Sequence, residues 1–518
     1  MAFITVDSSR LYALAFSGLF IILFVVALFH PLFLRFSKPV AVFINRALFY
    51  TPLLHRHRFF GPWTTAEFVV QSGYVIANLV SISFNASSVS MASLCAGRLA
   101  LFNMIPLFLS PDLAFLADSL GLPLRVFRKV HCSSGVMTMM MTLVHVCLMA
   151  FQKRAQDLYT LLAGAFLPNR LTYFTHLSRL LRKMLYEGFL RIHQALAIFA
   201  ASLICRHLLA VPDFSWLYLY VYASVACCLN IFYLALTLYR NVARGKPFPR
   251  ASLKSQGGGT TIIVDLPRPV HIDAGQYVNL WIWAPKISFW TCMQSHPFTV
   301  ASWSPDGQVR LELFAKSRRG LTSKMTGTPQ TDTSNVPWLK CLAFFSGPHG
   351  SRIDISDYKS AIMVASDYGI VAMLPFLQKF VYGYKFFTGR ICRIHIIWHI
   401  KTSGLPAIQH ILNQYLGDAE LRSVLQLSVF KESDTRMNWV GSHGRLSVLN
   451  EAPTISEIFL EEINGDFVTH SDQDESSQQV DKFIANPAKL LLRDRVRKEV
   501  RKHLYEDMEL RELDYQIQ

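Results

Sequence analysis

The sequence of 518 residues contains no Cys-x-x-Cys pair, and its nine cysteines are scattered along the chain. Several of them lie inside apolar runs, where a thiol behaves as a small hydrophobic side chain. Neither a disulfide framework nor a thiolate metal site is therefore indicated. Charge is scarce as well, since 17% of the residues are charged whereas 52% are hydrophobic. These proportions exclude an ordinary soluble globular protein.

The N-terminal stretch lacks the basic residues that begin a signal peptide, and the apolar run after it is too long for a signal-peptide core, so we expect a retained span. Apolar runs of about 20 residues, the length that crosses about 30 Å of hydrocarbon, crowd into the first part of the chain. The candidate spans are 11–34, 66–85, 93–109, 130–150, 189–210 and 215–238. After residue 240 the composition is that of a soluble protein, long enough for two domains of about 100 to 150 residues each.

Basic residues between the spans predict the membrane topology. They concentrate between the first two spans and between the third and fourth, as Arg35, Lys38, Arg46, Arg56 and Arg58, and as Arg125, Arg128 and Lys129. Positive residues mark cytosolic loops, so both loops should face the cytosol and the N-terminus should lie outside. The net charge of +16 then reflects membrane topology, and no nucleic-acid partner is expected.

Six spans that start outside would leave the second half of the chain outside, although the basic tail YRNVARGKPFPR after the last span indicates the cytosol. We therefore expect a seventh crossing at 155–180. An asparagine, a histidine and two arginines in that segment would each be costly in lipid, so an external loop or an error in gene prediction is the alternative. Asn85 begins an Asn-Ala-Ser glycosylation sequon in an expected external loop.

Two of the spans carry histidines at one repeated spacing. FRKVHCSSGVMTMMMTLVHVCLM contains His131 and His145, and FLRIHQALAIFAASLICRHLL contains His193 and His207. Each separation is fourteen positions, which on an α-helix comes to about 1,400° and puts both rings on one face, roughly 21 Å apart along the axis. A single histidine on an apolar face is usually a packing residue, but two matched pairs favour metal ligation.

Imidazole is a neutral ligand that suits iron, copper or zinc, and no carboxylate or thiolate accompanies the four histidines in a regular way to complete two zinc sites. A porphyrin asks the protein for two axial ligands only, so the sequence predicts two stacked bis-histidine haems that pass single electrons across the bilayer. If residues 155–180 cross the membrane, the helices are parallel and His131 pairs with His193, and His145 with His207. Without that crossing, His131 pairs with His207, and His145 with His193.

Short runs of alternating polarity follow an expected linker, GKPFPRASLKSQGGG, and predict a small antiparallel barrel. The runs are TTIIVDLP, QYVNLWIW, HPFTVASW and QVRLELFAK. Behind them, Gly320, Thr322 and Ser323 precede an expected helix, whose N-terminal amides and hydroxyls suit a pyrophosphate.

A second fold is predicted beyond the barrel. The apolar run AIMVAS meets a turn at Asp367-Tyr368-Gly369 and continues into a helix, IVAMLPFLQKF. This is a βα crossing of the kind that cradles a dinucleotide, although the turn lacks a complete G-x-G-x-x-G. Further strands at 393–400 and 424–430 are consistent with a doubly wound parallel sheet.

Together these motifs resemble the fungal ferric reductases, relatives of the NADPH oxidases, over nearly the whole chain. The resemblance rests on the paired histidine helices, HPFTVA, the Gly-Leu-Thr turn, GPHG in place of the usual GPYG, and MVASDYGIVAMLPFL in place of a glycine-rich nicotinamide loop. It implies a multi-domain membrane protein with an all-α transmembrane haem-binding bundle of six or seven helices, a ferredoxin-reductase-like β-barrel FAD domain and an α/β NADPH-binding domain. The implied boundaries are 1–245, 246–355 and 356–518.

The resemblance also assigns site residues, none of them a catalytic side chain. The ligands of two b-type haems would be His131, His145, His193 and His207. FAD would be held by His296, Pro297, Phe298, Thr299, Val300, Gly320 and Thr322. NADPH would be held by Gly347, Pro348, His349 and Gly350, and by Ala365, Ser366, Asp367, Gly369 and Ile370.

In such proteins hydride passes from NADPH to FAD, and electrons then pass singly to an inner haem, an outer haem and an external ferric chelate. FAD is needed because a hydride delivers two electrons and a haem takes one. We therefore expect a multi-pass ferric-chelate reductase of the plasma membrane with its C-terminal half in the cytosol. Its acceptor would be a ferric chelate or siderophore iron, and it would serve iron uptake in a functional link with an iron permease and oxidase system.

Two alternatives stay open. A superoxide-generating NADPH oxidase would use the same relay and differ at the exposed outer pocket. A degenerate, non-catalytic membrane interaction protein is suggested by three departures: the weak span at 155–180, His349 in place of tyrosine, and Ala485-Asn486-Pro487 in place of a Gly-Pro turn. Retention of all four histidines argues against it. The choice between NADPH and NADH is also open, because Arg390 and Arg393 could meet a 2′-phosphate, although solvated surface charge is the favoured interpretation.

Overall fold

The structure is a computed structural model of the chain. It describes residues 45–49, 51–54, 63–84, 86–110, 112–152, 186–211, 216–256, 259–284, 291, 295–316, 338–401, 406–432, 445–464, 482–485, 490–503, 508–511 and 513. The first candidate span at 11–34, the expected crossing at 155–180, the sequon residue Asn85, and Gly320 and Thr322 lie outside these residues.

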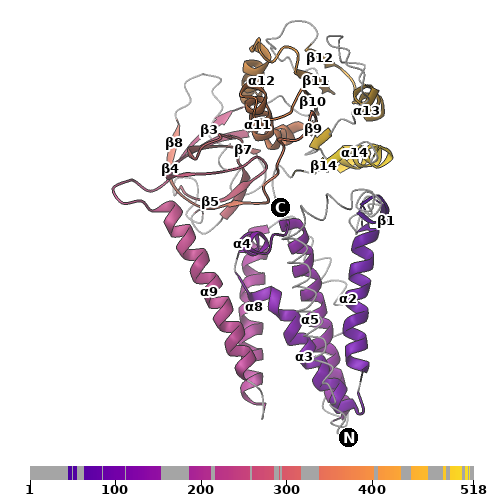
Figure 1. Ribbon diagram of the computed structural model, residues 1–518. Helices are drawn as coiled ribbons and strands as arrows, with labels where there is room; N and C mark the ends of the chain where they lie inside the picture. The colour runs from indigo at the N-terminus through magenta and orange to yellow at the C-terminus, as the bar shows by residue number, and fades with distance from the viewer. Residues whose placement is uncertain are drawn as a thin grey trace. The chain divides into compact units, whose positions relative to one another are not determined.

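The described N-terminal part of the chain is mainly helical (Figure 1). Its helices are α2 (Thr65–Ser83), α3 (Val89–Phe108), α4 (Leu113–Ser119), α5 (Leu124–Gln152), α8 (Tyr186–Leu209) and α9 (Trp216–Asn241), after a short η1 (Asn45–Phe49) and the strands β1 (Pro52–Leu54) and β2 (Trp63–Thr64). Among the described helices, four are long and apolar enough to cross a membrane: Val89–Phe108, Leu124–Gln152, Gly188–Leu209 and Leu219–Asn241. The expected span at 66–85 forms α2 but is not one of these four.

Side-chain caps fix where the helices of this part begin. Ser88 precedes α3, and its hydroxyl accepts a hydrogen bond of 3.2 Å from the amide of Met91. Asp112 precedes α4, and its carboxylate accepts one of 2.8 Å from the amide of Ala114. The same carboxylate accepts a hydrogen bond of 2.9 Å from the hydroxyl of Tyr233 on α9. Capping residues thus satisfy amide groups that a helix start leaves without partners.

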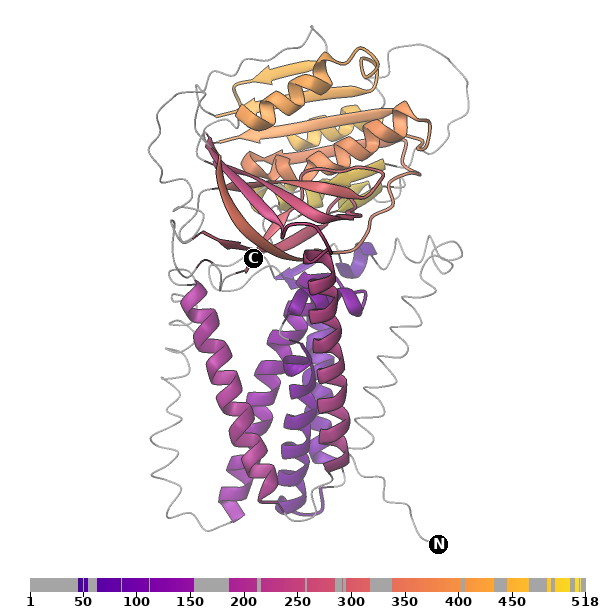
Figure 2. The ribbon, with the colours of Figure 1, turned by 90° about the vertical axis from the view of Figure 1, so that its left-hand side faces the viewer.

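α3 packs along α5 in the bundle (Figure 2). Leu99 of α3 is buried against Met137 and Met141 of α5. The buried amide group of Asn103 on α3 donates a hydrogen bond of 2.8 Å to Asn78 of α2, so a polar contact joins the first two helices. Polar groups away from water are tolerated when they are paired in this way.

A six-stranded antiparallel sheet follows the helices, in the order β6-β5-β8-β3-β4-β7. Its strands are β3 (Arg250–Gln256), β4 (Gly259–Val270), β5 (Tyr277–Trp283), β6 (Ser295–Thr299), β7 (Gln308–Lys316) and β8 (Leu339–His349). The four runs of alternating polarity are confirmed as strands. The expected linker is wrong in part, because its residues 250–256 form β3, which pairs with both β4 and β8.

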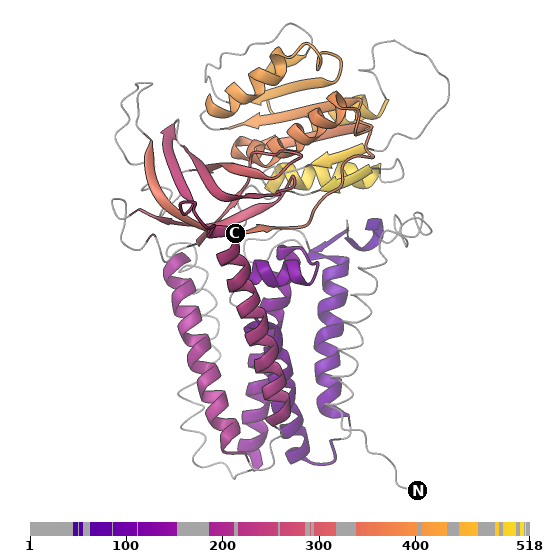
Figure 3. The same ribbon diagram turned by 60° about the vertical axis from the view of Figure 1, so that its left-hand side comes forward.

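A second sheet of six parallel strands has the order β12-β11-β10-β9-β13-β14. Its strands are β9 (Ser360–Ser366), β10 (Arg393–Ile400), β11 (Leu425–Lys431), β12 (Leu446–Leu449), β13 (Lys482–Ala485) and β14 (Met508–Arg511), and its helices are α11 (Leu374–Lys385), α12 (Pro406–Gly417), α13 (Ile455–Asn464) and α14 (Leu490–Lys502). Helices lie along both faces of this sheet (Figure 3). The predicted doubly wound α/β domain is confirmed.

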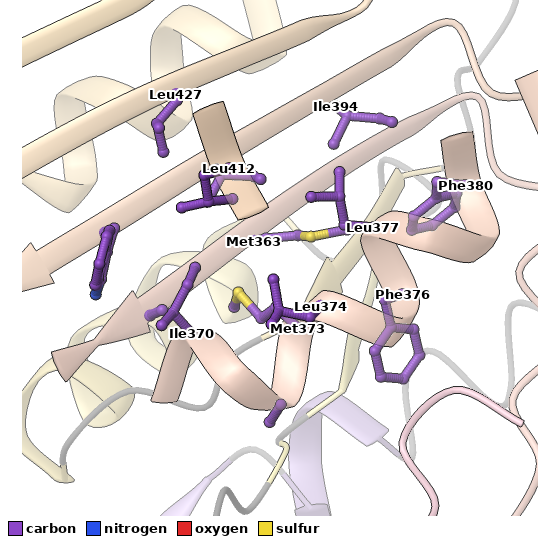
Figure 4. Close-up of a cluster of buried hydrophobic side chains, with 14 of the residues drawn as sticks. Met363, Ile370, Met373, Leu374, Phe376, Leu377, Phe380, Ile394, Leu412 and Leu427 are labelled. Carbon is purple, nitrogen blue, oxygen red and sulfur yellow. The ribbon is translucent and has the colours of Figure 1, made fainter. Parts of the chain in front are cut away.

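Both faces of β9 are buried. Ala361, Met363 and Ala365 pack in one hydrophobic cluster with α11 and α12, and the intervening Ile362 and Val364 pack in another with α13 and α14. Side chains alternate across a strand, so a strand covered on both faces needs a continuous apolar run. Figure 4 shows Met363 together with Met373, Leu374, Leu377 and other residues of the first cluster.

The helix expected at 370–380 differs from the structure. Residues Asp367–Met373 form a 3₁₀ helix, η3, and α11 begins only at Leu374. Pro375 lies in the first turn of α11, where its missing N–H group leaves no hydrogen bond unmade. The proline therefore starts a new α-helix at this point, and the turn before it stays tightly wound.

Candidate functional site

The four predicted histidines form two facing pairs between α5 and α8. The ring centroids of His131 and His193 are 6.3 Å apart, and those of His145 and His207 are also 6.3 Å apart. Both pairs join residues at matching positions of the two helices, so α5 and α8 run parallel. Of the two pairings that the sequence left open, the structure has the parallel one.

The separation of the rings can be compared with that of two ligands on one metal ion. A metal–imidazole bond is about 2 Å long and the bonded nitrogen lies about 1 Å from its ring centroid, so two rings on opposite sides of one ion have centroids about 6 Å apart. Among the described residues, no group of three or more His, Cys, Asp and Glu side chains could hold a metal ion. Each pair therefore suits a metal that brings its other ligands with it, as a haem iron does.

His145 is held by α3. Its Nδ1 lies 2.8 Å from the backbone carbonyl oxygen of Ser93, and 3.2 Å from the Ser93 hydroxyl. A carbonyl only accepts hydrogen bonds, so Nδ1 carries the proton and Nε2 keeps its lone pair for a metal ion. Gly97, one turn further along α3, makes this approach possible, since a Cβ atom there would lie 3.1 Å from Nδ1 of His145.

In the antiparallel sheet, strand β5 brings two predicted motifs together. Tyr277 of β5 pairs with Thr299 of β6 on one side and with His349 of β8 on the other. The HPFTV residues, predicted to hold FAD, and the GPHG residues, predicted to face NADPH, therefore flank β5 on its two sides, one strand apart. The rings of Tyr277 and His349 have centroids 5.5 Å apart, so the histidine that replaces the usual tyrosine packs on an aromatic neighbour.

The side chains of the HPFTV residues divide between two environments. Phe298 and Val300 belong to the hydrophobic core of the barrel, at 2% and 1% exposure. His296 and Pro297 are partly exposed, and the polar side chain of Thr299 is buried. A flavin at this strand would therefore meet the side chains of His296, Pro297 or Thr299, and only the backbone of Phe298 and Val300.

The GPHG turn depends on glycine backbone geometry. Gly347 has φ +113°, and a Cβ atom there would lie 3.0 Å from the carbonyl oxygen of Tyr277. Gly350 has φ +99°, and its carbonyl accepts a hydrogen bond of 2.9 Å from Gln276. Positive φ values of this size favour glycine, which explains why the turn keeps both of them. His349 is buried, and its Nε2 lies 3.0 Å from the hydroxyl of Ser346.

The last turn of α9 is joined to the same strand. The side chain of Asn241 donates a hydrogen bond of 2.6 Å to the carbonyl of Phe345 and accepts one of 2.9 Å from its amide. The neighbouring Arg240 donates to the carbonyl of Gly347. Asn241 is buried, so this backbone-like pairing ties β8 and the GPHG turn to the end of the helix.

At the carboxyl end of β9, Asp367 occupies a position normally suited to glycine. Its φ is +47°, in the left-handed region that aspartate tolerates better than most residues. Its carboxylate accepts a hydrogen bond of 2.8 Å from the amide of Lys401, and its carbonyl accepts one of 3.0 Å from the indole of Trp398. Ala365, Ser366, Gly369 and Ile370, the other predicted residues of this turn, are buried.

Tyr368 in the same turn extends to the antiparallel sheet. Its hydroxyl packs against Gly259 of β4 so closely that a Cβ atom on this glycine would lie 2.5 Å from the hydroxyl oxygen. The ammonium group of Lys316 lies 5.2 Å from the centre of its ring. Burial, reinforced by the Asp367 carboxylate, raises the pKa of Tyr368 to about 12, so the hydroxyl stays protonated at neutral pH.

A charged cluster stands at the carboxyl ends of β10 and β11, next to the Asp367 turn. The carboxylate of Glu432 accepts hydrogen bonds from Nζ of Lys401 at 2.8 Å and from Nε2 of His399 at 2.9 Å. Burial lowers the pKa of His399, although its bond to Glu432 opposes this effect. Ligands of open parallel sheets bind beyond the carboxyl ends of the strands, so this cluster faces the region where a nucleotide is expected.

Arg393 lies at the opposite end of the sheet, where β10 begins. Its guanidinium donates hydrogen bonds of 2.8 and 2.7 Å to Glu462 of α13. The structure therefore contradicts both earlier interpretations of Arg393: the residue is engaged in an ion pair, away from the carboxyl ends of the strands. Arg390, which is exposed, lies just before that strand.

The antiparallel sheet is the part of the chain that matches a known protein family. Residues 248–353 match the family model of an FAD-binding domain. The flavin part of the prediction is thereby supported: the antiparallel sheet is an FAD-binding domain of the ferredoxin-reductase-like kind, and it is followed by a parallel-sheet nucleotide-binding domain. No curated protein sequence matches the chain.

Several solved structures are similar at low sequence identity. A cytochrome P450 reductase from Amycolatopsis, GcoB, shares 10% identity over 53% of this chain and 73% of its own, with a TM-score of 0.31. A flavohemoglobin from Malassezia yamatoensis with bound FAD and heme shares 13% over 82% and 99%, with a TM-score of 0.37. Ferredoxin-NADP+ reductase from Plasmodium falciparum shares 9% over 53% and 98%, with a TM-score of 0.30.

The FAD-binding domain and the parallel-sheet domain share an interface along α11. Lys379 forms an ion pair of 2.7 Å with Asp273 and also donates to the carbonyl of Ile353. Gly275, with φ +86°, lies against Phe376 so closely that a Cβ atom would be 2.9 Å from the ring. These contacts fix the flavin sheet next to the turn after β9.

Sequence reasoning missed three parts of this site. The first is the pair Ser93 and Gly97, which no motif distinguishes from other small residues of an apolar helix. The second is Asn241, which resembles an ordinary helix end. The third is the Lys401 and Glu432 cluster, whose members lie on separate strands. The rule that parallel strands present their carboxyl ends together could have found this last set.

Proposed function

We propose that the protein is a transmembrane ferric-chelate reductase. It takes electrons from NADPH, carries them through FAD and two b-type haems, and delivers them to Fe(III) chelates on the other side of the membrane. The observation that carries the proposal is the equal spacing of the two histidine pairs, 6.3 Å between ring centroids in each. Two such pairs on parallel helices suit two stacked metal centres, about 21 Å apart along the helix axis.

The C-terminal half supplies the chemistry that feeds these centres. FAD, when bound, accepts the two electrons of a hydride and releases them one at a time. The residues of this chain position the reactants: Thr299 of β6 and the GPHG turn of β8 lie on either side of β5, and η3 follows the carboxyl end of β9. The interface along α11 keeps the two surfaces together, which favours direct transfer between nucleotide and flavin.

The topology and the acceptor belong to the same proposal. Following the distribution of basic residues, the FAD-binding and nucleotide-binding domains lie in the cytosol and the protein resides in the plasma membrane. His131 and His193 then form the inner pair, and His145 and His207 the outer pair. A ferric chelate or siderophore iron outside the cell is the electron acceptor, and the reduced iron would feed an iron permease and oxidase system.

Sealed membrane vesicles with the cytosolic face inside test this function. With NADPH enclosed and a ferric chelate added outside, we expect reduction of the external iron, measured with a membrane-impermeant ferrous-iron indicator. Superoxide release that exceeds iron reduction under the same conditions would favour the NADPH oxidase alternative. If NADPH reduces neither acceptor and no flavin, the protein is not an electron-transfer enzyme.

A further inference from the structure

We propose that Ser93 and Gly97 of α3 are positioning residues for His145, and that they give the haems at the two histidine pairs unequal reduction potentials. The inference rests on the proposed haem ligation and concerns which residues tune it. It begins from the contacts of the two α5 histidines, which lie on the same helix and differ in what surrounds Nδ1.

His145 is hydrogen-bonded through Nδ1. The Ser93 carbonyl lies 2.8 Å away, and the Ser93 hydroxyl donates a further bond of 3.2 Å to the backbone carbonyl of His145. Ser93 is buried, so these bonds do not compete with water. A ligating histidine whose other nitrogen donates to a backbone carbonyl is fixed in tautomer and ring orientation, and its basicity rises.

Gly97 determines how closely the helices approach at this point. A Cβ atom on Gly97 would meet three atoms of the imidazole, at 3.1, 3.3 and 3.5 Å. Any larger residue must push the ring away from α3 and lengthen the bond to Ser93. The glycine is therefore needed for the close packing of a side chain, while its backbone is ordinary α-helix.

His131 has no such hydrogen bond at Nδ1 within the described part of the chain. This nitrogen is buried there without a hydrogen-bond partner. The facing residue on α8, His193, is stacked on Phe189, with 6.1 Å between the two ring centroids. The two pairs have the same ring separation and different surroundings. The ligand geometry is thus matched while the basicity of the ligands is not.

This asymmetry has a direction. The ferric state carries one more positive charge than the ferrous state, so a more basic axial ligand stabilises it and lowers the reduction potential. The site at His145 and His207 should therefore be the more strongly reducing of the two. In the proposed topology it is the outer site, which delivers electrons to the external acceptor.

Redox titration of the purified full-length protein, followed by haem absorbance, tests the inference in Gly97→Ala. We expect both haems to remain bound and one of the two midpoint potentials to rise. A tenfold change in the ratio of ferrous to ferric haem at a fixed potential would appear as a shift of about 59 mV for a one-electron centre. Gly73→Ala on α2 is the matched control, because a Cβ atom there meets nothing described within 4 Å.

Ser93→Ala provides a milder second variant if Gly97→Ala does not fold. It removes the hydroxyl and keeps the carbonyl, so the same midpoint should rise by less. Electron paramagnetic resonance of the oxidised protein should show a changed ligand field at one haem only. Potentials that stay unchanged, or that move together in both variants, would overturn the inference while leaving haem binding intact. Absence of haem from the wild type would instead overturn the proposed function.

Discussion

Replacing Glu462 removes the centre of a buried charged network in the nucleotide-binding domain. Its carboxylate accepts hydrogen bonds of 2.8 and 2.7 Å from Arg393 and of 2.7 Å from Nδ1 of His395. The other ring nitrogen of His395 lies 2.8 Å from the hydroxyl of Ser428. The side chains of Glu462 and His395 are 1% and 3% exposed, so water cannot take over these bonds.

The pKa of Glu462 gives the size of the effect. Burial on its own would raise the pKa of this carboxyl group, but the hydrogen bonds from His395 and Arg393 outweigh it and hold the pKa at about 2, below the ordinary 4.5. The difference corresponds to about 3 kcal/mol of folding free energy, at about 1.4 kcal/mol per pH unit. Because the folded pKa is the lower one, this contribution is complete above pH 4.5 and is lost as the pH falls towards 2.

Thermal unfolding of the full-length protein in detergent tests this reasoning. Glu462→Gln at pH 7 should lower the unfolding midpoint of this domain by roughly 6 to 12 °C, taking about 2 to 4 °C per kcal/mol for a domain of 150 to 250 residues. The gap to wild type should close as the pH is lowered from 4.5 towards 2. Glu461→Gln, at an exposed position of the same helix, is the control. Equal midpoints for the two variants at pH 7 would refute the argument.

Three further changes follow from the site. Asn241→Ala leaves the amide and carbonyl of one β8 residue unpaired, which should cost roughly 2 to 4 kcal/mol, and FAD should dissociate faster in fluorescence assays; unchanged FAD retention would show that the link to α9 does not support the turn. Gly275→Ala places a methyl group 2.9 Å from Phe376, so the rate of flavin reduction by NADPH should fall in stopped-flow experiments, whereas an unaltered rate would mean that the interface along α11 adapts. Glu432→Gln frees Lys401 and removes a negative charge near the expected nucleotide, so the ratio of kcat/KM for NADPH to that for NADH should rise; a fall would place the 2′-phosphate elsewhere.

Much of the C-terminal half could be predicted because its strands carry local signals. The run RIHIIWHI is β10 to the residue, since a strand buried on both faces needs uninterrupted apolar side chains. The run RASLKSQ was mistaken for a linker because it is short, polar and next to glycines. Its strand identity comes from pairing with β4 and β8, which are set by contacts far away in the sequence.

The membrane half shows a different limit. Histidine spacing on each helix predicted which rings share a face, because that depends on helix geometry alone. Which histidine faces which depends on the relative direction of α5 and α8, and a poorly apolar segment between them gave no firm answer. The contact of His145 with Ser93 was also beyond prediction, since it follows from how closely α3 and α5 pack.

Difference spectra of reduced minus oxidised membranes test the central claim most directly. The account predicts a b-type haem signal corresponding to two haems per chain and a signal of smaller amplitude in His145→Ala. The signal should be unchanged in His410→Ala, whose histidine lies exposed on α12. In His145→Ala, NADPH should still reduce the flavin while external ferric reduction is abolished. Wild-type membranes without any haem signal would contradict the account.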